Sequence, residues 1–257
     1  MKHWTAFPHD SSAYRYDNKA LKAIWPELHR GDCEPVPQDG AILEAWAAFH
    51  AGEFGEAVVL ADKLGIAAHA IANKASGIYA NYLEEDEKRR IDLFQAAIAR
   101  AEEAIDQFPD DPNAHYFHAF NLGRYSQSIS VVKAVKQGYA SKIRESLEAT
   151  LELQPSHAEA NTAMGLYHAE LIDKMGRMIG SMTYGASESE ALEHLEAAVA
   201  LTPDSPIAHI EYANGLYLIY GDKRLDEVTD LYVKASEMTP RDAMEKLDVE
   251  FAVSELE

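Results

Sequence analysis

Histidines are the residues of this sequence whose type and spacing come closest to a chemical site. His115 and His118 are three residues apart, so they would share one face of a helix. His157 and His168 follow in the next segment. A zinc site needs three or four ligands at fixed geometry, and nothing in the sequence fixes the distance between the two pairs. We therefore expect no metal site and interpret these histidines as packing or groove-lining residues.

The only cysteine, Cys33, lies between Asp32 and Glu34. Their charges should raise the pKa of the thiol and lower its reactivity. A lone cysteine also excludes a disulfide framework. The sequence contains no G-x-S-x-G nucleophile elbow, no Gly-rich phosphate loop and no dinucleotide fingerprint. We therefore predict no catalytic residues, no enzyme activity and no cofactor.

Charge is distributed unevenly along the chain. Its 257 residues carry 43 Asp and Glu against 23 Lys and Arg, a net charge of −20, which argues against nucleic-acid binding. Between Pro112 and Arg144, however, there is no acidic residue. We define the basic band of this stretch as Lys133, Lys136, Lys142 and Arg144. Such a band could attract an anionic ligand or an acidic partner, and pairing with acidic flanks is the alternative.

The elements that position these residues are predicted to be helices. From Ala41 onward, Ala, Leu, Glu and Lys dominate, and apolar residues recur with the period of an amphipathic helix. Four such segments are each closed by a proline, at Pro109, Pro155, Pro203 and Pro240. A helix start follows each: Pro112 and Pro206 suit a first helical position, whereas Ser156 with Glu159 and Asp242 with Glu245 have capping-box spacing. Each unit is therefore predicted to be a pair of helices.

Small residues recur at matching places in these units. Ala119, Gly165 and Ala213 take a small position in the first helix, and Ala97, Ala101 and Ala104 precede Pro109 in a second helix. This pattern, over roughly residues 41–242, resembles the tetratricopeptide repeat (TPR). The resemblance implies an all-α fold, a right-handed solenoid of helix pairs in which small residues let helices pack closely.

Three regions are predicted. Residues 1–40 form an arm rich in aromatics and proline that packs on the body, and Asp17 caps a short helix that Pro26 ends. Residues 41–242 form the repeat domain, with inserts near 125–140 and 171–187, because two of its units exceed the TPR length of about 34 residues. Residues 243–257 form a capping helix with Met244, Leu247 and Phe251 on one face and acids elsewhere.

The resemblance also implies a concave groove lined by the first helices. The predicted groove residues are Trp46, His50, Tyr116, Phe120, Arg124, Thr162, Leu166, Asn214 and Tyr217. Aromatic side chains in a groove suit the capture of a peptide or helix. We therefore predict a non-catalytic scaffold or adaptor that binds a protein or peptide, and homo-oligomerisation stays open.

The second insert holds Met175, Met178 and Met182 at helical spacing among glycines. They could form an adaptable partner-binding flap, or fill a gap in the core as most apolar stripes do. The stretch from Gly185 to Tyr217 is similar to the helical T-component of bacterial TRAP-type transport systems. That similarity implies an alternative function, a solute-binding accessory protein.

The sequence has no run of about 18 apolar residues that could span a membrane. Residues Met1 to Asp10 lack the apolar run of a secretory signal. We therefore expect no membrane span and a cytoplasmic location.

Overall fold

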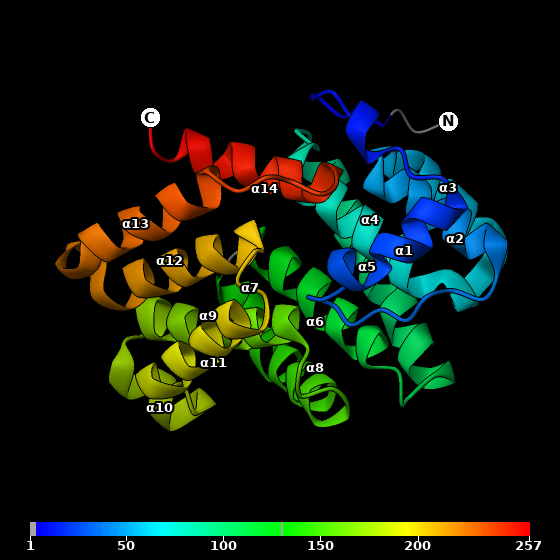
Figure 1. The fold of residues 1–257 in the computed structure, drawn as a ribbon. Coiled ribbons are helices and arrows are strands. Elements are labelled where there is room, and N and C mark those ends of the chain that lie inside the picture. Colours follow the sequence, from blue (N-terminus) through cyan, green and yellow to red (C-terminus); the bar gives the residue numbers. More distant parts are fainter. Residues whose placement is uncertain (1–3, 130) are drawn as a thin grey trace. The chain divides into compact units, whose positions relative to one another are not determined.

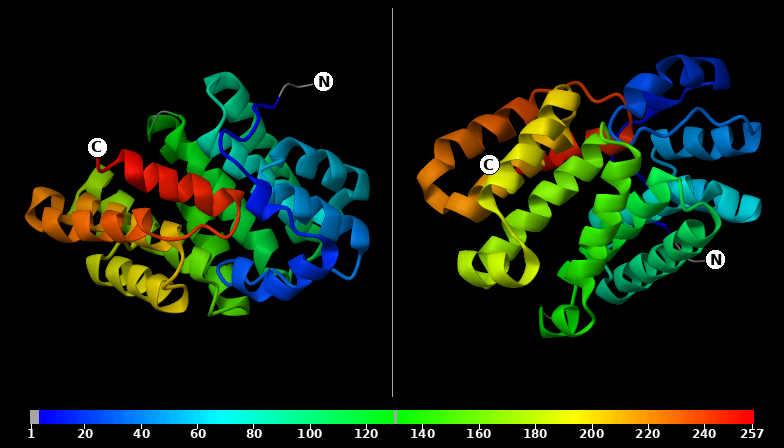
Figure 2. Two further views of the ribbon diagram at one scale, coloured as in Figure 1. Left: turned by 45° about the horizontal axis from the view of Figure 1, so that its top comes forward. Right: turned by 90° about the horizontal axis from the view of Figure 1, so that it is seen from below.

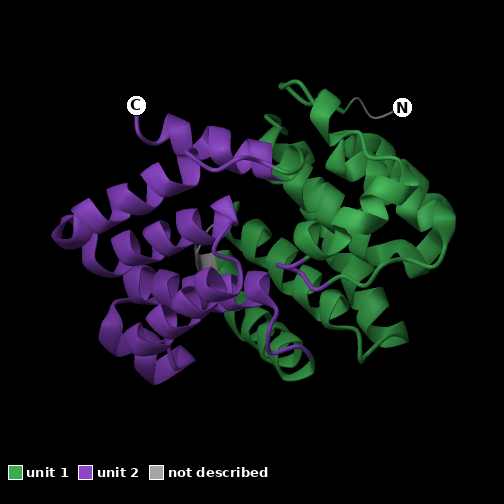
Figure 3. Ribbon diagram, viewed as in Figure 1, with its two compact units in different colours: residues 1–29, 34–153, 241–244 green, residues 30–33, 154–240, 245–257 purple. Residues whose placement is uncertain are grey.

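The computed structural model describes residues 4–129 and 131–257, without the side chains of residues 131 and 132. Residues 1–3 of the predicted arm and residue 130 of the first insert lie outside this description. Every regular element in the described ranges is a helix (Figure 1). The chain divides into two compact units, unit 1 with residues 1–29, 34–153 and 241–244, and unit 2 with residues 30–33, 154–240 and 245–257 (Figure 3). Each is described by itself.

Unit 1 is built from eight of the described helices. They are α1 (Asn18–Leu28), α2 (Gly40–His50), α3 (Phe54–Leu64), α4 (His69–Tyr82), α5 (Glu87–Gln107), α6 (Pro112–Gln127), α7 (Val131–Lys136) and α8 (Tyr139–Leu153). Short 3-10 turns lie at Ser12–Tyr14 and Gly65–Ala68. Consecutive helices from α2 to α6 contact one another, and α6 also packs on α8, as expected of stacked helix pairs.

Aspartates set the starts of the helices in unit 1. Asp17, Asp39, Asp86 and Asp111 each accept a hydrogen bond from a main-chain N–H of the first turn. These bonds satisfy donors that a helix start leaves without a partner. The predicted end of α1 at Pro26 is wrong, because the helix continues to Leu28. Proline removes only one donor, and the next turn still closes with a bond from His29 N to Trp25 O.

Helix α4 is the central helix of unit 1, since its residues from His69 to Ala80 are all buried. Its approach to α6 depends on Gly77, where a Cβ would lie 2.5 Å from Cε1 of Phe120. Because protein interiors are close-packed, the absence of a side chain at Gly77 lets Phe120 and Asn121 of α6 lie against the backbone of α4.

Unit 2 contains α9 (Ala158–Met175), α10 (Arg177–Tyr184), α11 (Glu188–Leu201), α12 (Pro206–Tyr220), α13 (Leu225–Ser236) and most of α14 (Ala243–Ser254). A 3-10 turn, Gly221–Arg224, joins α12 to α13. Helix α9 packs on α11 and α12, and α12 and α13 lie side by side in both views of Figure 2. At Gly165 in α9, a Cβ would lie 2.5 Å from Cγ of Leu195, so this small residue lets α9 and α11 interlock.

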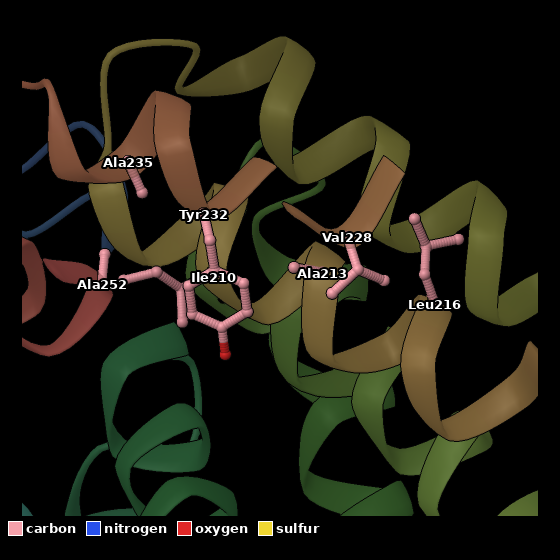
Figure 4. Packing of buried hydrophobic residues seen from close by; sticks show 7 residues of the cluster. All are labelled: Ile210, Ala213, Leu216, Val228, Tyr232, Ala235 and Ala252. Atoms are coloured by element: carbon pink, nitrogen blue, oxygen red, sulfur yellow. The ribbon is translucent and has the colours of Figure 1, made fainter. Parts of the chain in front are cut away.

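One core cluster of unit 2 lies between α12, α13 and α14. Ile210, Ala213 and Leu216 of α12 pack with Val228, Tyr232 and Ala235 of α13, and Ala252 of α14 belongs to the same cluster (Figure 4). Helix α14 corrects one expectation: Glu245 and Asp248 are buried, whereas Phe251 is partly exposed. A helix that contacts its neighbours over more than its apolar face buries some of its polar residues as well.

The predicted proline-closed helices are present: α5, α8, α11 and α13 end before Pro109, Pro155, Pro203 and Pro240. Asp111 and Ser205 occupy the N-cap positions before Pro112 and Pro206, as predicted. The predicted cap at Ser156 is wrong by one residue. His157 is the N-cap of α9, and its Nδ1 accepts the N–H of Ala160 at 3.0 Å.

A recurring hydrogen bond, which we call the turn tie, closes three of these turns. His115 Nε2 donates to the carbonyl of Pro109 at 2.8 Å, and His209 Nε2 donates to the carbonyl of Pro203 at 2.9 Å. Asn161 Nδ2 donates to Pro155 O at 3.4 Å. In each case the donor lies six residues after the proline. The tie fixes the first turn of a helix to the proline-containing turn that precedes it.

Candidate functional site

Three predicted groove residues form one row on α6. The rings of Tyr116 and Phe120 stack with centroids 6.1 Å apart, and the guanidinium carbon of Arg124 lies 5.9 Å from the Phe120 ring. Residues four apart on a helix are neighbours, so the sequence itself aligns these side chains. Tyr116 is buried, whereas Phe120 and Arg124 are half-buried. The exposed end of the row is therefore cationic.

Tyr125 connects this row to the first insert. Its hydroxyl accepts hydrogen bonds from Gln95 Nε2 of α5 at 3.1 Å and from Lys133 Nζ of α7 at 3.3 Å. The Lys133 ammonium also lies 5.7 Å from the centre of the Tyr125 ring, a cation–π contact. The Tyr139 ring of α8 packs edge-on against Tyr125, and burial together with Tyr125 raises the pKa of Tyr139. The buried side chain of Tyr125 thus links α7 to α5, α6 and α8.

The basic band lies on α7 and α8. Lys133, Lys136 and Lys142 are exposed, and Arg144 is half-buried with its Nε 2.7 Å from Oε1 of Glu148. Pairing with acidic residues, the alternative from the sequence, thus applies to Arg144. Within the described ranges Lys136 and Lys142 form no ion pair with a carboxylate. These two lysines keep their positive charge available to solvent.

The other two groove residues of unit 1 are not on an open surface. Trp46 and His50 are fully buried, because α1 covers this side of α2. His50 Nδ1 lies 2.7 Å from Oδ2 of Asp242, and its Nε2 lies 3.3 Å from Nε2 of His29. The Asp242 carboxylate accepts the hydrogen bond from His50 Nδ1, and one of the two Nε2 atoms donates to the other. Trp46 and His50 therefore pack inside unit 1 and correct the groove assignment at these positions.

Unit 2 holds the remaining groove residues. Thr162 is buried and donates its hydroxyl to Ala158 O within α9, and Leu166 is half-buried. Asn214 donates to Glu211 Oε2 and accepts from the Tyr232 hydroxyl. Tyr217 is 48% exposed. Of these four, Tyr217 is the side chain most open to a partner.

The second insert forms α10, which packs on α9. Gly176, with φ of 77°, separates the two helices, and Gly185 in the left-handed region ends α10. The interpretation of the methionines as core residues is wrong for two of them, because Met178 is 72% and Met182 is 82% exposed. Ile179 lies beside them and is also exposed.

The histidines mainly fix the structure. Burial lowers the pKa of His118, whose Nδ1 lies 2.8 Å from the Ser146 hydroxyl of α8. Among the described residues, no group of three His, Cys, Asp or Glu side chains is arranged to hold a metal ion.

The thiol of Cys33 is a poor nucleophile at neutral pH. Its pKa is raised chiefly by burial, and the charges of Asp32 and Glu159 add to this effect. The sequence pointed to charge alone and named Glu34 as the second acid. A thiol with a raised pKa carries little thiolate, the form that reacts.

Similarity to solved structures concerns the fold. A thermophilic TPR protein of Thermus thermophilus matches with a TM-score of 0.58 and 17% identity, over 83% of this chain and 97% of the other. Structures of two monomeric IFIT1 mutants, one with Gppp-AAAA and one with m7Gppp-AAAA, match at 16% identity over 92% of this chain and 59% of theirs, with a TM-score of 0.46. The fold is therefore all-α and TPR-like. None of the described helices combines the length and apolarity needed to cross a membrane.

Comparison with protein families gives one match. A family model described as regulator of microtubule dynamics protein 1-3 matches residues 65–248, which is more than half of the chain. A search of curated proteins finds no match. The matched range includes α4 to α13 and the whole basic band.

Proposed function

Because the chain belongs to the family of regulators of microtubule dynamics 1–3, we propose that it is a non-catalytic adaptor whose basic band binds an acidic surface of a protein partner. Stacked helix pairs present long surfaces without needing a reactive centre. The TPR-like fold and the family both favour a scaffold over an enzyme. The fold alone does not specify a partner, so the proposal depends on the side chains of unit 1.

The observation that carries the proposal is the exposed lysine pair, Lys136 and Lys142, in a chain with a net charge of −20. An acidic partner is repelled by most of such a chain and attracted by this band, so charge would orient the encounter. The aromatic row that ends in Arg124 lies on α6, which contacts both α7 and α8.

Polymerised microtubules are the first partner to test, since the family is described by proteins that regulate microtubule dynamics. The assay is co-pelleting of the wild-type chain and a Lys136→Glu, Lys142→Glu variant. We expect the wild type to pellet with microtubules and the variant to stay in the supernatant. Pelleting of the wild type should fall as the salt concentration rises, because salt screens the attraction between the lysines and an acidic surface.

A matched control is available in unit 1. Lys19 and Lys22 of α1 are exposed as well, so Lys19→Glu with Lys22→Glu makes the same change in net charge elsewhere. This control should pellet like the wild type. Equal pelleting of all three proteins would remove the basic band from the proposal, and pelleting of none would remove microtubules as its partner.

The alternative function, a solute-binding accessory protein, stays a hypothesis. So do binding in a concave groove, homo-oligomerisation and the cytoplasmic location. A solute that binds only the folded chain would raise its melting temperature, and a screen of organic acids by thermal shift tests that alternative directly.

A further inference from the structure

Residues 4–10, which we call the arm segment, lie on unit 1 like a bound peptide. They contain no helix or strand. Trp4 packs its ring edge-on against Tyr79 of α4, with centroids 4.4 Å apart. Phe7 packs edge-on against Phe54 of α3 at 6.4 Å. Two aromatic anchors three residues apart thus hold the arm segment.

Each anchor sits over a glycine. A Cβ at Gly55 would lie 2.4 Å from Cγ of Trp4, and a Cβ at Gly52 would lie 2.6 Å from Cγ of Phe7. Gly52 also has a φ of 80°, which favours glycine by itself, whereas Gly55 lies within α3. The backbone of Gly55 therefore does not require glycine, and the close approach of the indole does.

Polar contacts complete the surface of unit 1 that holds the arm segment, which we call the seat. The Tyr79 hydroxyl accepts the main-chain N–H of Thr5 at 2.9 Å and lies 3.3 Å from the Thr5 hydroxyl. The guanidinium carbon of Arg89 lies 5.8 Å from the centre of the Trp4 ring and 5.7 Å from that of Tyr79. A cation over an aromatic ring interacts most favourably with tryptophan, so Arg89 favours an indole at this position.

We propose that Gly52, Gly55, Tyr79 and Arg89 form a peptide-binding site for a partner segment with Trp and Phe three residues apart, and that the arm segment occupies this site in cis. The seat matches the chemistry of such a peptide: two ring positions, one acceptor for a main-chain N–H and one cation over the indole. Extended peptides are commonly bound in this way, by a few buried aromatic anchors.

This site is separate from the basic band and does not depend on the proposed function. Residues 4–10, Gly52 and Gly55 lie outside the range that the family model matches, 65–248, whereas Tyr79 and Arg89 lie within it. A tethered segment competes at a high effective concentration, so the arm would block a weak external peptide and yield to a strong one. Occupancy of the seat by the arm would thus set the affinity that a partner must have.

The test uses the full chain and a fluorescein-labelled peptide with the sequence of residues 4–10, WTAFPHD. Its binding is measured by fluorescence polarisation to the wild type and to a Trp4→Ala, Phe7→Ala variant, in which the arm no longer fills the seat. We expect the variant to bind the peptide at least about tenfold more tightly than the wild type does.

Adding Gly55→Ala to the released variant should abolish this binding. Alanine is the better helix former, so the substitution fills the indole position without threatening α3. Tyr79→Phe, added instead, keeps the ring and removes the hydroxyl that contacts both the main-chain N–H and the side chain of Thr5, and it should weaken binding by about fivefold or more. Circular dichroism checks that each variant is folded.

Three results would overturn the proposal. They are equal peptide binding by the wild type and the released variant, no binding by either, and binding that Gly55→Ala leaves unchanged. A wild-type dimer that the Trp4→Ala, Phe7→Ala substitutions dissociate would also overturn it, because the seat would then serve exchange of arms between two copies.

Discussion

The two inserted helices, α7 and α10, occupy the same position in their helix pairs and present different chemistry. Helix α7 lies in the chain between the paired helices α6 and α8, and α10 lies between the paired helices α9 and α11. Helix α7 is tied to Tyr125 through Lys133 and exposes Lys136. Helix α10 is bounded by Gly176 and Gly185 and exposes Met178 and Met182. The same topology thus carries a basic surface in one unit and an apolar surface in the other.

The helix pairs beneath the inserts are alike. Both have a turn tie and a small residue in the first helix, Ala119 in α6 and Gly165 in α9. Packing therefore constrains the paired helices and leaves the insert free to vary. In such an array, the surface chemistry that distinguishes one unit from the next is carried largely by the inserts.

The largest expected effect is the difference in stability between a Gly→Ala substitution in the helix pair of α9 and one in the helix pair of α6. Gly165→Ala should destabilise the chain by about 3 kcal/mol, because its Cβ would meet Leu195 Cγ at 2.5 Å and Ala191 O at 2.9 Å. The same change at Gly123 in α6, where a Cβ meets nothing within 4 Å, should stabilise by about 0.5–1 kcal/mol. Urea unfolding of both variants measures the difference, and effects of the same sign would contradict it.

The contribution of a turn tie to stability should differ between the two units, because the donor histidine is more buried in one of them. His209 is buried, so His209→Ala leaves the Pro203 carbonyl without its donor and should cost about 2 kcal/mol. His115 is half-buried, water can replace its ring, and His115→Ala should cost about 1 kcal/mol. Thermal unfolding of the two variants tests this order. A larger loss for His115→Ala would show that burial does not set the strength of the tie.

The Tyr125 hydroxyl should contribute to the attachment of α7. Tyr125→Phe removes the acceptor that Gln95 and Lys133 share and should cost about 1 kcal/mol, with faster hydrogen exchange in α7. The double change Met178→Ser, Met182→Ser on α10 is the matched control in the other insert. Both methionines are exposed, so stability should change by less than about 0.5 kcal/mol. Equal losses in the two inserts would contradict the proposed anchoring of α7.

Acid should weaken unit 2 more than unit 1. Burial lowers the pKa of His118 in unit 1 and of His194 and His209 in unit 2, from an ordinary value of 6.5. Below that value the unfolded chain binds more protons than the folded chain, so the stability present above pH 6.5 is lost as pH falls through the lowered pKa values. Hydrogen exchange at about pH 7.5 and about pH 5.5 should show the larger loss of protection in α11 and α12 than in α6. Greater loss in α6 would contradict this.

The helix pairs were predictable because their determinants are local. Periodicity, small residues such as Gly165 and closing prolines each act within one helix or one turn. The turn tie was not predicted, although its donor stands six residues after Pro109, Pro155 and Pro203 in the sequence. The cap at His157 was missed because Ser, Thr, Asp and Asn are the usual caps, and imidazole rarely takes their place.

The candidate site was less predictable because exposure depends on distant neighbours. His50 is 21 residues from His29 and 192 residues from Asp242, and no local pattern brings these three together. Tyr116, Phe120 and Arg124 were named as groove residues on the resemblance to the TPR; their spacing of four residues aligns them in one row, and their role in a groove stays a prediction. Exposure of Met178 and Met182 was not predicted, since an apolar stripe has the same spacing whether it is covered or open.

The turn tie has a consequence for how the chain folds. Its donor and acceptor are only six residues apart, so closing the loop between them costs little entropy. Each tie can therefore form early, before contacts between distant helices form. It fixes the turn that precedes a helix, so the next helix pair can pack against a turn that is already ordered. Since the turn tie recurs at three of the four proline-closed turns, folding has several equivalent starting points, and ordered structure can spread from any of them to the neighbouring helix pairs.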